Sequence, residues 1–569
     1  MWKSIVLCIA LLCLCEGSAS TTGESEGSSS NIRRGRGPHR KLGLLESAWQ
    51  RIQNILAEPR VTVTQEFYDV VIVGAGMAGL AAAAELKAID PDISYIILES
   101  SNRIGGRVRS TTFGAAGKQF VVEDGANWLY EDSSYPTWQL ANDLGLQSFK
   151  NDYRDFTMYD TTGTQVADAT AQARLDVFLD AFREAEKDAD NEFEDTGDSG
   201  FVDKGVVGLL NQNGWNVASD SSGNMDYIFQ WLFVDFEYAE SDTSQRFFPY
   251  ESGDPYLVTD QRGFEHLVQT YQANNVPSDR IRLNTKVQAI NYDVNFCGGP
   301  GPLYKAIVNT DFVEYYAQRV INTVSVGVHN SNGIIYRPSL AYPPETTNPY
   351  KMAQYIKVFY QFSTKFWDSK QFVYVMRDVS QRGQCHHWQD MDVEIPGSGI
   401  IRCELMTEAF EALIDSTTLE LSAATLDSLL DPLRSAYGTS TVGTPIATYY
   451  PKLNLDRDFG YGAYGNWQVG RTFSEFARFF GGVDEFSSRC DHNGCNSLGE
   501  WIVQFSGSAS CYEHSEFVHG AFFAGQRSAR FAMDSLGKDV DTGKSECDVS
   551  FSEFGFTPFM GVGANRSNV

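Results

Sequence analysis

The stretch Tyr68–Gly79, YDVVIVGAGMAG, restricts the possible folds of this chain more than any other feature. Its apolar, β-branched run at 70–73 is typical of a buried parallel strand. The pattern G-x-G-x-x-G follows this run, and an Ala- and Leu-rich helical pattern, LAAAAELKAI, follows the glycines. This order predicts a strand, a tight turn and a helix whose N-terminal N–H groups face a pyrophosphate. We therefore expect a Rossmann-type dinucleotide site here.

The glycines and a following acid have separate roles in such a site. Gly74 permits the tight turn, Gly76 lets the backbone approach the pyrophosphate, and Gly79 lets helix and strand pack closely. A second predicted strand, 95–98, ends at Glu99, where an acid accepts hydrogen bonds from a ribose hydroxyl. A glycine-rich turn without a ligand is the alternative, and the flanking strand, helix and acid argue against it. The predicted cofactor-binding residues of this unit are Gly74, Gly76, Met77, Ala78, Gly79 and Glu99.

Two further motifs distinguish FAD from NAD. They are RIGGR at 103–107 and DGANW at 124–128. Together with the Rossmann glycines, they resemble the flavin-containing amine oxidase family, whose members carry E-x-x-x-R-x-G-G-R and G-A-N-W or G-x-x-W after those glycines. The resemblance implies bound FAD, contacted by Arg107, Asn127 and Trp128.

Other pieces extend the resemblance, in chain order, over most of 66–535, and the closest of them resemble the polyamine oxidase branch. The family implies an α/β fold in which a Rossmann-type FAD-binding domain is interleaved with an α+β substrate-binding domain, the p-hydroxybenzoate hydroxylase-like architecture. Val287 corresponds to an adenine-contacting valine, and 519–533 to the closing helix under the flavin. We expect the FAD-binding domain over 66–134, 256–337 and 496–540, and the substrate-binding domain over 135–255 and 338–495.

The terminal segments have simpler patterns. Residues 1–20 combine Lys3, an apolar run and small residues, as in a secretory signal peptide. We expect a secreted protein without a transmembrane span, because no later run of 18 or more apolar residues appears; a signal anchor is the alternative. The Ser/Gly-rich, then basic stretch 21–41 is typical of a disordered linker, with a processing site or anion-binding tail as alternatives. We also expect an N-terminal helix over 42–65, a helix over 167–187, an acidic, Gly-rich stretch at 188–205 and a C-terminal tail over 541–569.

Charge and cysteine content limit the classes of partner. The 45 basic and 73 acidic residues give a formal net charge of −28, which argues against nucleic-acid binding. Such a charge attracts cations, including polyamines, although solubility alone explains it equally well. Ten cysteines are present, and seven remain beyond the signal peptide, an odd number. Cys490 and Cys495 are close enough to form a disulfide; the histidines beside them and beside Cys385 do not complete a metal-binding pattern, so we assign no metal.

The segment 353–367, AQYIKVFYQFSTKFW, contains the predicted catalytic lysine. Amine oxidation removes a hydride equivalent from the carbon beside nitrogen, and flavin N5 accepts it. The segment resembles the polyamine oxidase pattern Y-x-K-I-F-x-x-F-x-x-K-F-W, which implies that Lys357 lies near N5 through a water and that Tyr355 lines the pocket. An exposed strand lysine is the alternative.

The resemblance also implies two aromatic rings and an acid around the substrate. YGAYGNWQVG at 461–470 maps one ring to Tyr464, and the second maps to Phe517. A ring face attracts a nearby cation by ~0.5–2 kcal/mol. WLFVDFEYAE at 231–240 maps a tunnel acid to Glu237, with Glu240 as the alternative, and Tyr130 stands where some relatives have a second acid.

The chain departs from the family pattern near its closing helix. The family usually has F-A-G-E-x-[TS]-S, and this chain has FSGSASC at 505–511. Ser508 therefore replaces a glutamate, and Glu516 replaces a glycine close to the flavin. We expect non-covalent FAD, since Cys511 is not at the family's covalent position. Gly507, Ser508 and Val518 complete the predicted cofactor-binding set.

Three functions remain open. The first is a secreted FAD-dependent oxidase of polyamines or related amines that uses O2 and releases an aldehyde, an amine and H2O2. The second is an L-amino-acid oxidase, which needs an arginine for the substrate carboxylate. The third is a secreted flavoprotein of weak catalysis, favoured by the changes at Ser508 and Glu516 and opposed by Lys357, Tyr355 and Tyr464.

Overall fold

The computed structural model describes residues 63–200, 202–235, 243–245, 253–292, 304–452, 462–480, 501–512, 514–540 and 547. Its first element, β1 (Thr64–Val73), is parallel to β2 (Tyr95–Leu98) on one side and to β12 (Val313–Asn322) on the other. The strand begins before the apolar run and includes the last two residues of the helix expected over 42–65. The rest of that predicted helix, the signal peptide and the linker lie outside the described residues.

The sheet around β1 has eight strands and mixed direction. β9 (Ile281–Arg282) is parallel to β2, and β21 (Val503–Phe505) is parallel to β12. On the far side of β12, β11 (Ala306–Asn309) is antiparallel to β12, and β10 (Ala289–Tyr292) is antiparallel to β11. β13 (Ile335–Arg337) is parallel to β10 and forms the edge of the sheet. Segments from three distant parts of the chain thus form one Rossmann-type sheet. This is expected, since parallel neighbouring strands are joined by long crossover connections.

The apolar run of β1 is buried on both faces. Val70 and Ile72 pack with α3 (Met77–Ile89), whereas Val71 and Val73 belong to the hydrophobic cluster on the opposite face. Side chains alternate along a strand, so a strand covered on both sides is apolar throughout.

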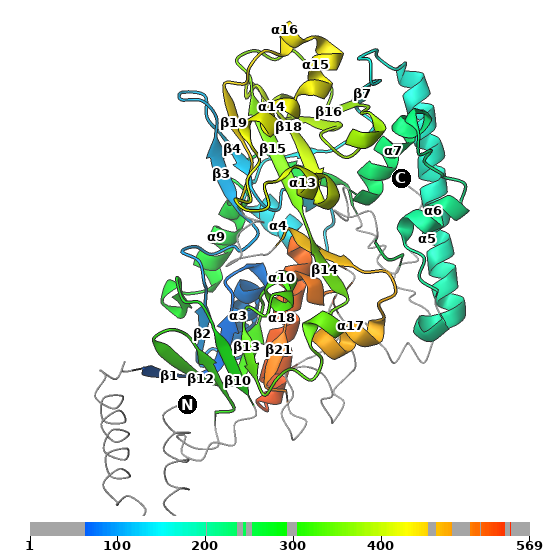
Figure 1. Cartoon of the computed structure of the whole chain (residues 1–569). Coiled ribbons are helices and arrows are strands. Elements are labelled where there is room, and N and C mark those ends of the chain that lie inside the picture. Colours follow the sequence, from blue (N-terminus) through cyan, green and yellow to red (C-terminus); the bar gives the residue numbers. More distant parts are fainter. Residues whose placement is uncertain are drawn as a thin grey trace, which may run out of the picture. The chain divides into compact units, whose positions relative to one another are not determined.

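Helix α18 (Val518–Ser535) packs across α3, as Figure 1 shows in orange-red beside blue. A Cβ atom at Gly525 would overlap the carbonyl oxygen of Ala78, so glycine permits the close approach of the two helices. The predicted closing helix is therefore anchored directly on the helix that follows the glycine motif.

A second sheet has the strand order β19–β15–β18–β17–β16–β7. It is called the substrate sheet below because its strands lie within the predicted substrate-binding domain. Its longest pairing joins β15 (Tyr355–Gln361) antiparallel to β18 (Ile400–Met406), and both strands are buried along their whole length. The remaining strands of this sheet are β7 (Phe156–Tyr159), β16 (Phe372–Val375), β17 (His387–Asp390) and β19 (Ala447–Tyr449).

Smaller sheets lie at the connections. They are β3 (Ser110–Phe113) with β4 (Phe120–Glu123), β14 (Tyr350–Ala353) with β20 (Tyr464–Trp467), and β5 (Trp128–Tyr130) with β8 (Pro255–Val258) and β6 (Ser148–Lys150). The longer helices beyond α3 and α18 are α4 (Pro136–Asp143), α5 (Asp168–Gly200), α6 (Val206–Gln212), α7 (Asn224–Gln230), α9 (Glu265–Asn275), α13 (Thr407–Leu413), α15 (Asp431–Tyr437) and α17 (Phe473–Phe480).

Helix α5 is longer than the sequence pattern predicts. It continues to Gly200 through much of the acidic, Gly-rich stretch at 188–205, which we expected to lie outside the helix. Ala185 and Ala189 extend its buried face beyond Leu175 and Phe178, and proline is absent from this part of the sequence. The described buried face of the helix thus reaches Ala189, inside the stretch that we expected to lie outside the helix.

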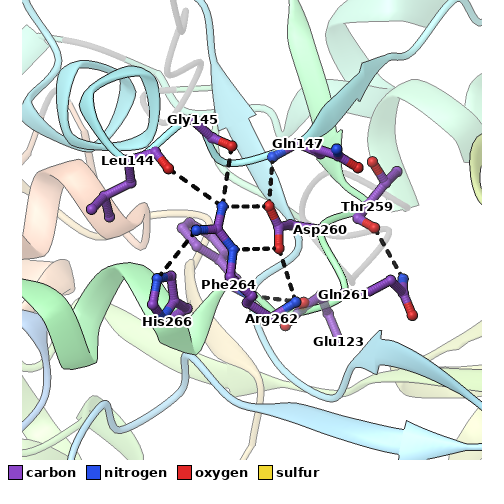
Figure 2. Close-up of polar contacts among 10 residues, drawn as sticks. All are labelled: Glu123, Leu144, Gly145, Gln147, Thr259, Asp260, Gln261, Arg262, Phe264 and His266. Carbon is purple, nitrogen blue, oxygen red and sulfur yellow. Dashed lines mark hydrogen bonds and ion pairs between the residues drawn. The ribbon is translucent and has the colours of Figure 1, made fainter.

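An ion pair fixes the turn between β8 and α9. Asp260 accepts hydrogen bonds from Arg262 and from the backbone N–H of Gln147, and Arg262 also donates to the carbonyls of Leu144 and Gly145 (Figure 2). The Asp260 side chain is 6% exposed. The pair therefore connects the start of α9 to the loop after α4.

Two disulfides join described segments, and the sequence predicted neither. Cys385 pairs with Cys403, and Cys511 pairs with Cys547. Cys490 and Cys495, the predicted pair, lie outside the described residues. No helix in the described part of the chain is long and apolar enough to cross a membrane. No cluster of three or more His, Cys, Asp or Glu side chains there is arranged to hold a metal ion.

Candidate functional site

One cavity lies at the carboxyl end of β1 and unites the two halves of the predicted site. It is lined by the glycine loop, by the segment 124–128, by Tyr355 of the substrate sheet and by the start of α18. Ligands of open α/β sheets bind at this end of the parallel strands. The predicted residues that line it are Gly74, Gly76, Met77, Ala78, Glu99, Arg107, Asn127, Trp128, Tyr130, Val287, Tyr355, Tyr464, Gly507, Ser508, Phe517 and Val518.

The glycine loop has the geometry that its sequence predicts. Gly74 has φ +103°, and a Cβ there would lie 2.5 Å from Thr323 Oγ1. A Cβ at Gly79 would overlap the carbonyl oxygen of Gly74. Gly79 is absent from the described cavity lining, because it holds α3 against the end of β1. Thr323, which our sequence analysis missed, donates a hydrogen bond to the Val73 carbonyl oxygen at 2.8 Å.

A second glycine pair packs against the first. A Cβ at Gly106 would lie 3.3 Å from the Gly76 Cα, so the two backbones meet closely. The Gly105 N–H donates to the Ala75 carbonyl oxygen at 2.9 Å, and Arg103 donates to the Gly106 carbonyl oxygen at 2.6 Å. Arg103 is thereby used to hold the loop in place.

Glu99 is buried at the end of β2, 5% exposed, and lines the cavity. Its Oε2 accepts a hydrogen bond from the Ala75 N–H at 2.7 Å, and its Oε1 accepts one from the Ser101 N–H at 2.9 Å. A carboxylate in this position fixes the glycine loop and retains lone pairs for a ribose hydroxyl, as the motif predicts.

Arg107 joins the two positions at which the chain departs from the family pattern. Its Nη1 lies 2.6 Å from Glu516 Oε2, and its Nη2 donates to Ser508 Oγ at 2.6 Å. Ser508 Oγ in turn donates to Glu516 Oε2 at 2.6 Å. The three side chains form a closed ring of hydrogen bonds in the wall of the cavity.

Lys357 is fully buried, so it is not the exposed strand lysine of the alternative interpretation. Its Nζ donates to the Gly125 carbonyl oxygen at 2.6 Å and to Asn127 Oδ1 at 2.7 Å. Among the described residues, Gly125 and Asn127 line the cavity, whereas Lys357 lies behind them. Burial lowers the pKa of Lys357, and the nearby Arg402 lowers it further.

Two aromatic pairs face the cavity. Tyr355 and Tyr464 have ring centroids 6.1 Å apart, and Tyr130 and Phe517 meet edge to face at 5.1 Å. Tyr355 comes from the substrate sheet and Phe517 from the start of α18, so the rings reach the cavity from separate elements. Burial raises the pKa of Tyr355 well above its ordinary value, which keeps the phenol neutral.

Buried polar atoms in the cavity wall fit a large polar cofactor. Asn127 Nδ2 and Glu516 Oε1 are buried and have no hydrogen-bond partner among the described residues. Buried polar groups are normally paired, so a ligand with both donors and acceptors suits this wall. With the glycine cradle, these residues fit FAD. The predicted substrate acids Glu237 and Glu240 lie outside the described residues, and the roles of all the site residues stay predictions.

Comparisons with known proteins identify the family. The model of the family described as flavin containing amine oxidoreductase matches residues 77–532. Polyamine oxidase 6 of Oryza sativa subsp. japonica is 25% identical over 83% of this chain and 92% of its own length. Polyamine oxidase 1 of Zea mays is 25% identical over 83% of this chain and 91% of its own length.

A solved structure shares the fold. A putrescine oxidase, the wild type bound to putrescine, superimposes with a TM-score of 0.57 at 20% identity, over 82% of this chain and 98% of that one. The predicted α/β architecture and family resemblance are therefore confirmed. This chain belongs to the flavin containing amine oxidoreductase family.

Proposed function

We propose that this protein is a secreted oxidase that uses non-covalently bound FAD and O2 to oxidise polyamines of the spermine or spermidine type. The overall reaction consumes the amine, O2 and water and yields an aminoaldehyde, a released amine and H2O2. FAD, when bound, supplies the hydride acceptor. The signal-peptide pattern predicted at 1–20 and the names of the polyamine oxidase relatives support the finer parts of this proposal.

One observation carries the proposal. A single cavity is lined both by the predicted dinucleotide residues, among them Gly76 and Glu99, and by the aromatic residues Tyr355, Tyr464 and Phe517. A dinucleotide site and an aromatic pocket that opens into it are what amine oxidation on a flavin requires. The aromatic faces attract the amine, and the apolar surroundings exclude water from the reacting carbon.

The environment of Lys357 suits a neutral amine. A neutral amino group has two N–H donors, and Lys357 Nζ has two acceptors, the Gly125 carbonyl oxygen and Asn127 Oδ1. Burial lowers its pKa, since a charged group loses its hydration there. Neutral Lys357 keeps a lone pair that can take a proton from a water or position that water by a hydrogen bond.

The described residues give less support to an L-amino-acid oxidase. Arg107 is the arginine in the described cavity lining, and Glu516 and Ser508 already bind its guanidinium. Non-covalent binding is supported by Cys511, whose sulfur is bonded to Cys547 and is unavailable to a flavin.

The test is a spectrum of the purified protein before and after anaerobic addition of spermine or spermidine. We expect flavin absorbance that bleaches with polyamine and returns with air, and acid should release the FAD. A folded protein that takes up no FAD contradicts the proposal. Flavin that is reduced by no polyamine, monoamine or amino acid would instead support a flavoprotein of weak catalysis.

A further inference from the structure

The ring formed by Arg107, Ser508 and Glu516 connects two departures that look unrelated in the sequence. Glu516 follows Ser508 by eight positions, and both approach Arg107, which is about 400 positions earlier. All three side chains line the cavity, and the Glu516 side chain is only 6% exposed. A carboxylate buried to this extent needs a cationic partner, and Arg107 provides one.

The two departures exchange a carboxylate between positions. The family pattern has a glutamate where this chain has Ser508 and a glycine where it has Glu516. Serine carries no charge to offer Arg107, yet its hydroxyl bridges the arginine and the displaced carboxylate at 2.6 Å on each side. In this chain the carboxylate on Arg107 therefore comes from position 516, and position 508 contributes a hydroxyl.

The backbone conformation at position 516 is also one that favours glycine. Glu516 has φ +68°, a left-handed conformation that glycine adopts freely and that glutamate rarely adopts. A Cβ at Gly465 would lie 2.8 Å from Glu516 Oε1, so the facing strand leaves room for the carboxylate. A strained residue persists where its surroundings hold it, and here three hydrogen-bonded groups do so.

We propose that Glu516 is a cofactor-positioning residue, and that Ser508 and Glu516 form one compensating exchange on Arg107. Glu516 Oε2 holds the guanidinium. Glu516 Oε1, buried in the cavity wall without a partner among the described residues, accepts a hydrogen bond from an N–H or O–H donor of FAD. The inference rests on the proposed function for its cofactor, whereas the exchange itself concerns protein residues alone.

The test is a double-mutant cycle with Ser508→Glu, Glu516→Gln and the double variant. Gln replaces Glu because it keeps the shape and the backbone strain, whereas Gly would relieve the strain and obscure the loss of charge. Each apoprotein is titrated with FAD by fluorescence, and its unfolding temperature is measured without FAD. Glu516→Gln should raise the Kd for FAD about tenfold, because it removes the charge from the hydrogen bond to Arg107.

The decisive result is that the effect of Ser508→Glu on the Kd for FAD and on the unfolding temperature has opposite signs in the two backgrounds. Ser508→Glu alone places two carboxylates on one arginine, so it should raise the Kd for FAD and lower the unfolding temperature of the apoprotein. In the Glu516→Gln background the same substitution restores the single carboxylate, so it should lower the Kd and raise the unfolding temperature. An effect of Ser508→Glu with the same sign in both backgrounds overturns the exchange.

Glu85→Gln is the matched control. Glu85 forms a part-buried ion pair with Arg530 at 2.7 Å, and neither residue belongs to the described cavity lining. Loss of this ion pair should lower the unfolding temperature and leave the Kd for FAD unchanged. If the Kd rises as much as in the Glu516→Gln variant, the effect is due to general destabilisation, and the positioning role is overturned. If the wild-type protein takes up no FAD, the proposed function and the positioning role fail, and the unfolding temperatures alone still decide whether the exchange is real.

Discussion

Lys357 Nζ lies 2.6 Å from the Gly125 carbonyl oxygen and so ties β15 of the substrate sheet to the segment 124–128, which lines the cavity. The contact crosses 232 positions of sequence. It places the predicted catalytic amine directly behind Gly125 and Asn127, which line the cavity.

Replacing Lys357 by Met should slow reduction of the flavin by the amine, reoxidation by O2, or both. Met has a similar length, so the fold and FAD binding should persist, while the group that handles protons and developing charge is lost. Stopped-flow absorbance measures the two half-reactions separately. Lys351→Met, at an exposed position of β14, is the control and should leave both rates unchanged. Wild-type rates in the Lys357 variant would remove this residue from the site.

The activity on polyamines should rise with pH from neutral to alkaline conditions. The reacting nitrogen must lose its proton before hydride leaves, and burial lowers the pKa of Lys357 so that this amine also becomes neutral. Initial rates of H2O2 formation between about pH 6 and about pH 10 measure the profile. A flat profile over this range is incompatible with the proposed chemistry.

Lys357 should also make stability depend on pH. Its folded-state pKa is lowered by burial, so between that pKa and its usual value of about 10.4 the unfolded chain binds more protons. The free energy of unfolding therefore rises with pH across this window, by up to about 1.4 kcal/mol per pH unit. The Lys357→Met variant lacks this term, so wild type should gain stability relative to it as pH rises. Urea unfolding at several pH values tests this, and parallel profiles would contradict it.

Gly79→Ala should prevent FAD binding. The added Cβ would overlap the Gly74 carbonyl oxygen, and α3 would have to move away from the end of β1. Small-to-large changes in a tight contact cost about 1–3 kcal/mol or more. The control is Gly208→Ala in α6, where the nearest atom to a Cβ is 3.6 Å away. This control should keep FAD, as measured by absorbance after gel filtration, and a Gly79→Ala variant with wild-type FAD content would refute the prediction.

Asp260→Asn should lower stability at neutral pH by about 1.5–3 kcal/mol, because Asp260 receives charge-assisted hydrogen bonds from Arg262. These bonds hold the pKa of Asp260 below its ordinary value. The stabilisation is present above the unfolded-state pKa of about 3.9 and is lost as pH falls through the folded-state pKa. The difference between variant and wild type should therefore shrink in acid. Asp254→Asn, in an exposed pair with Lys150, is the control and should change stability by less than about 0.5 kcal/mol.

The local sequence determined the cofactor half of this protein. The run 70–73, the three glycines and Glu99 lie within about thirty positions, so their spacing alone specifies a strand, a turn, a helix and an acid. The structure agrees at each of these places. Patterns of this kind are readable because each requirement, such as φ +103° at Gly74, is met by one residue type at one place.

The tertiary structure decided what depends on contacts between distant segments. The burial of Lys357, the disulfides of Cys385 with Cys403 and Cys511 with Cys547, and the approach of Gly525 to Ala78 all join separate elements. No local pattern encodes such partners, because packing chooses among many sequence-compatible arrangements.

Positions 508 and 516 show most directly what the sequence alone does not predict. In the sequence, Ser508 looks like the loss of an acid and Glu516 like the loss of a necessary glycine. In the folded chain both side chains meet at Arg107, and the carboxylate missing at one position is supplied from the other. The sequence determined which residues changed, and only the fold, by bringing both to one guanidinium, decided that the changes belong together.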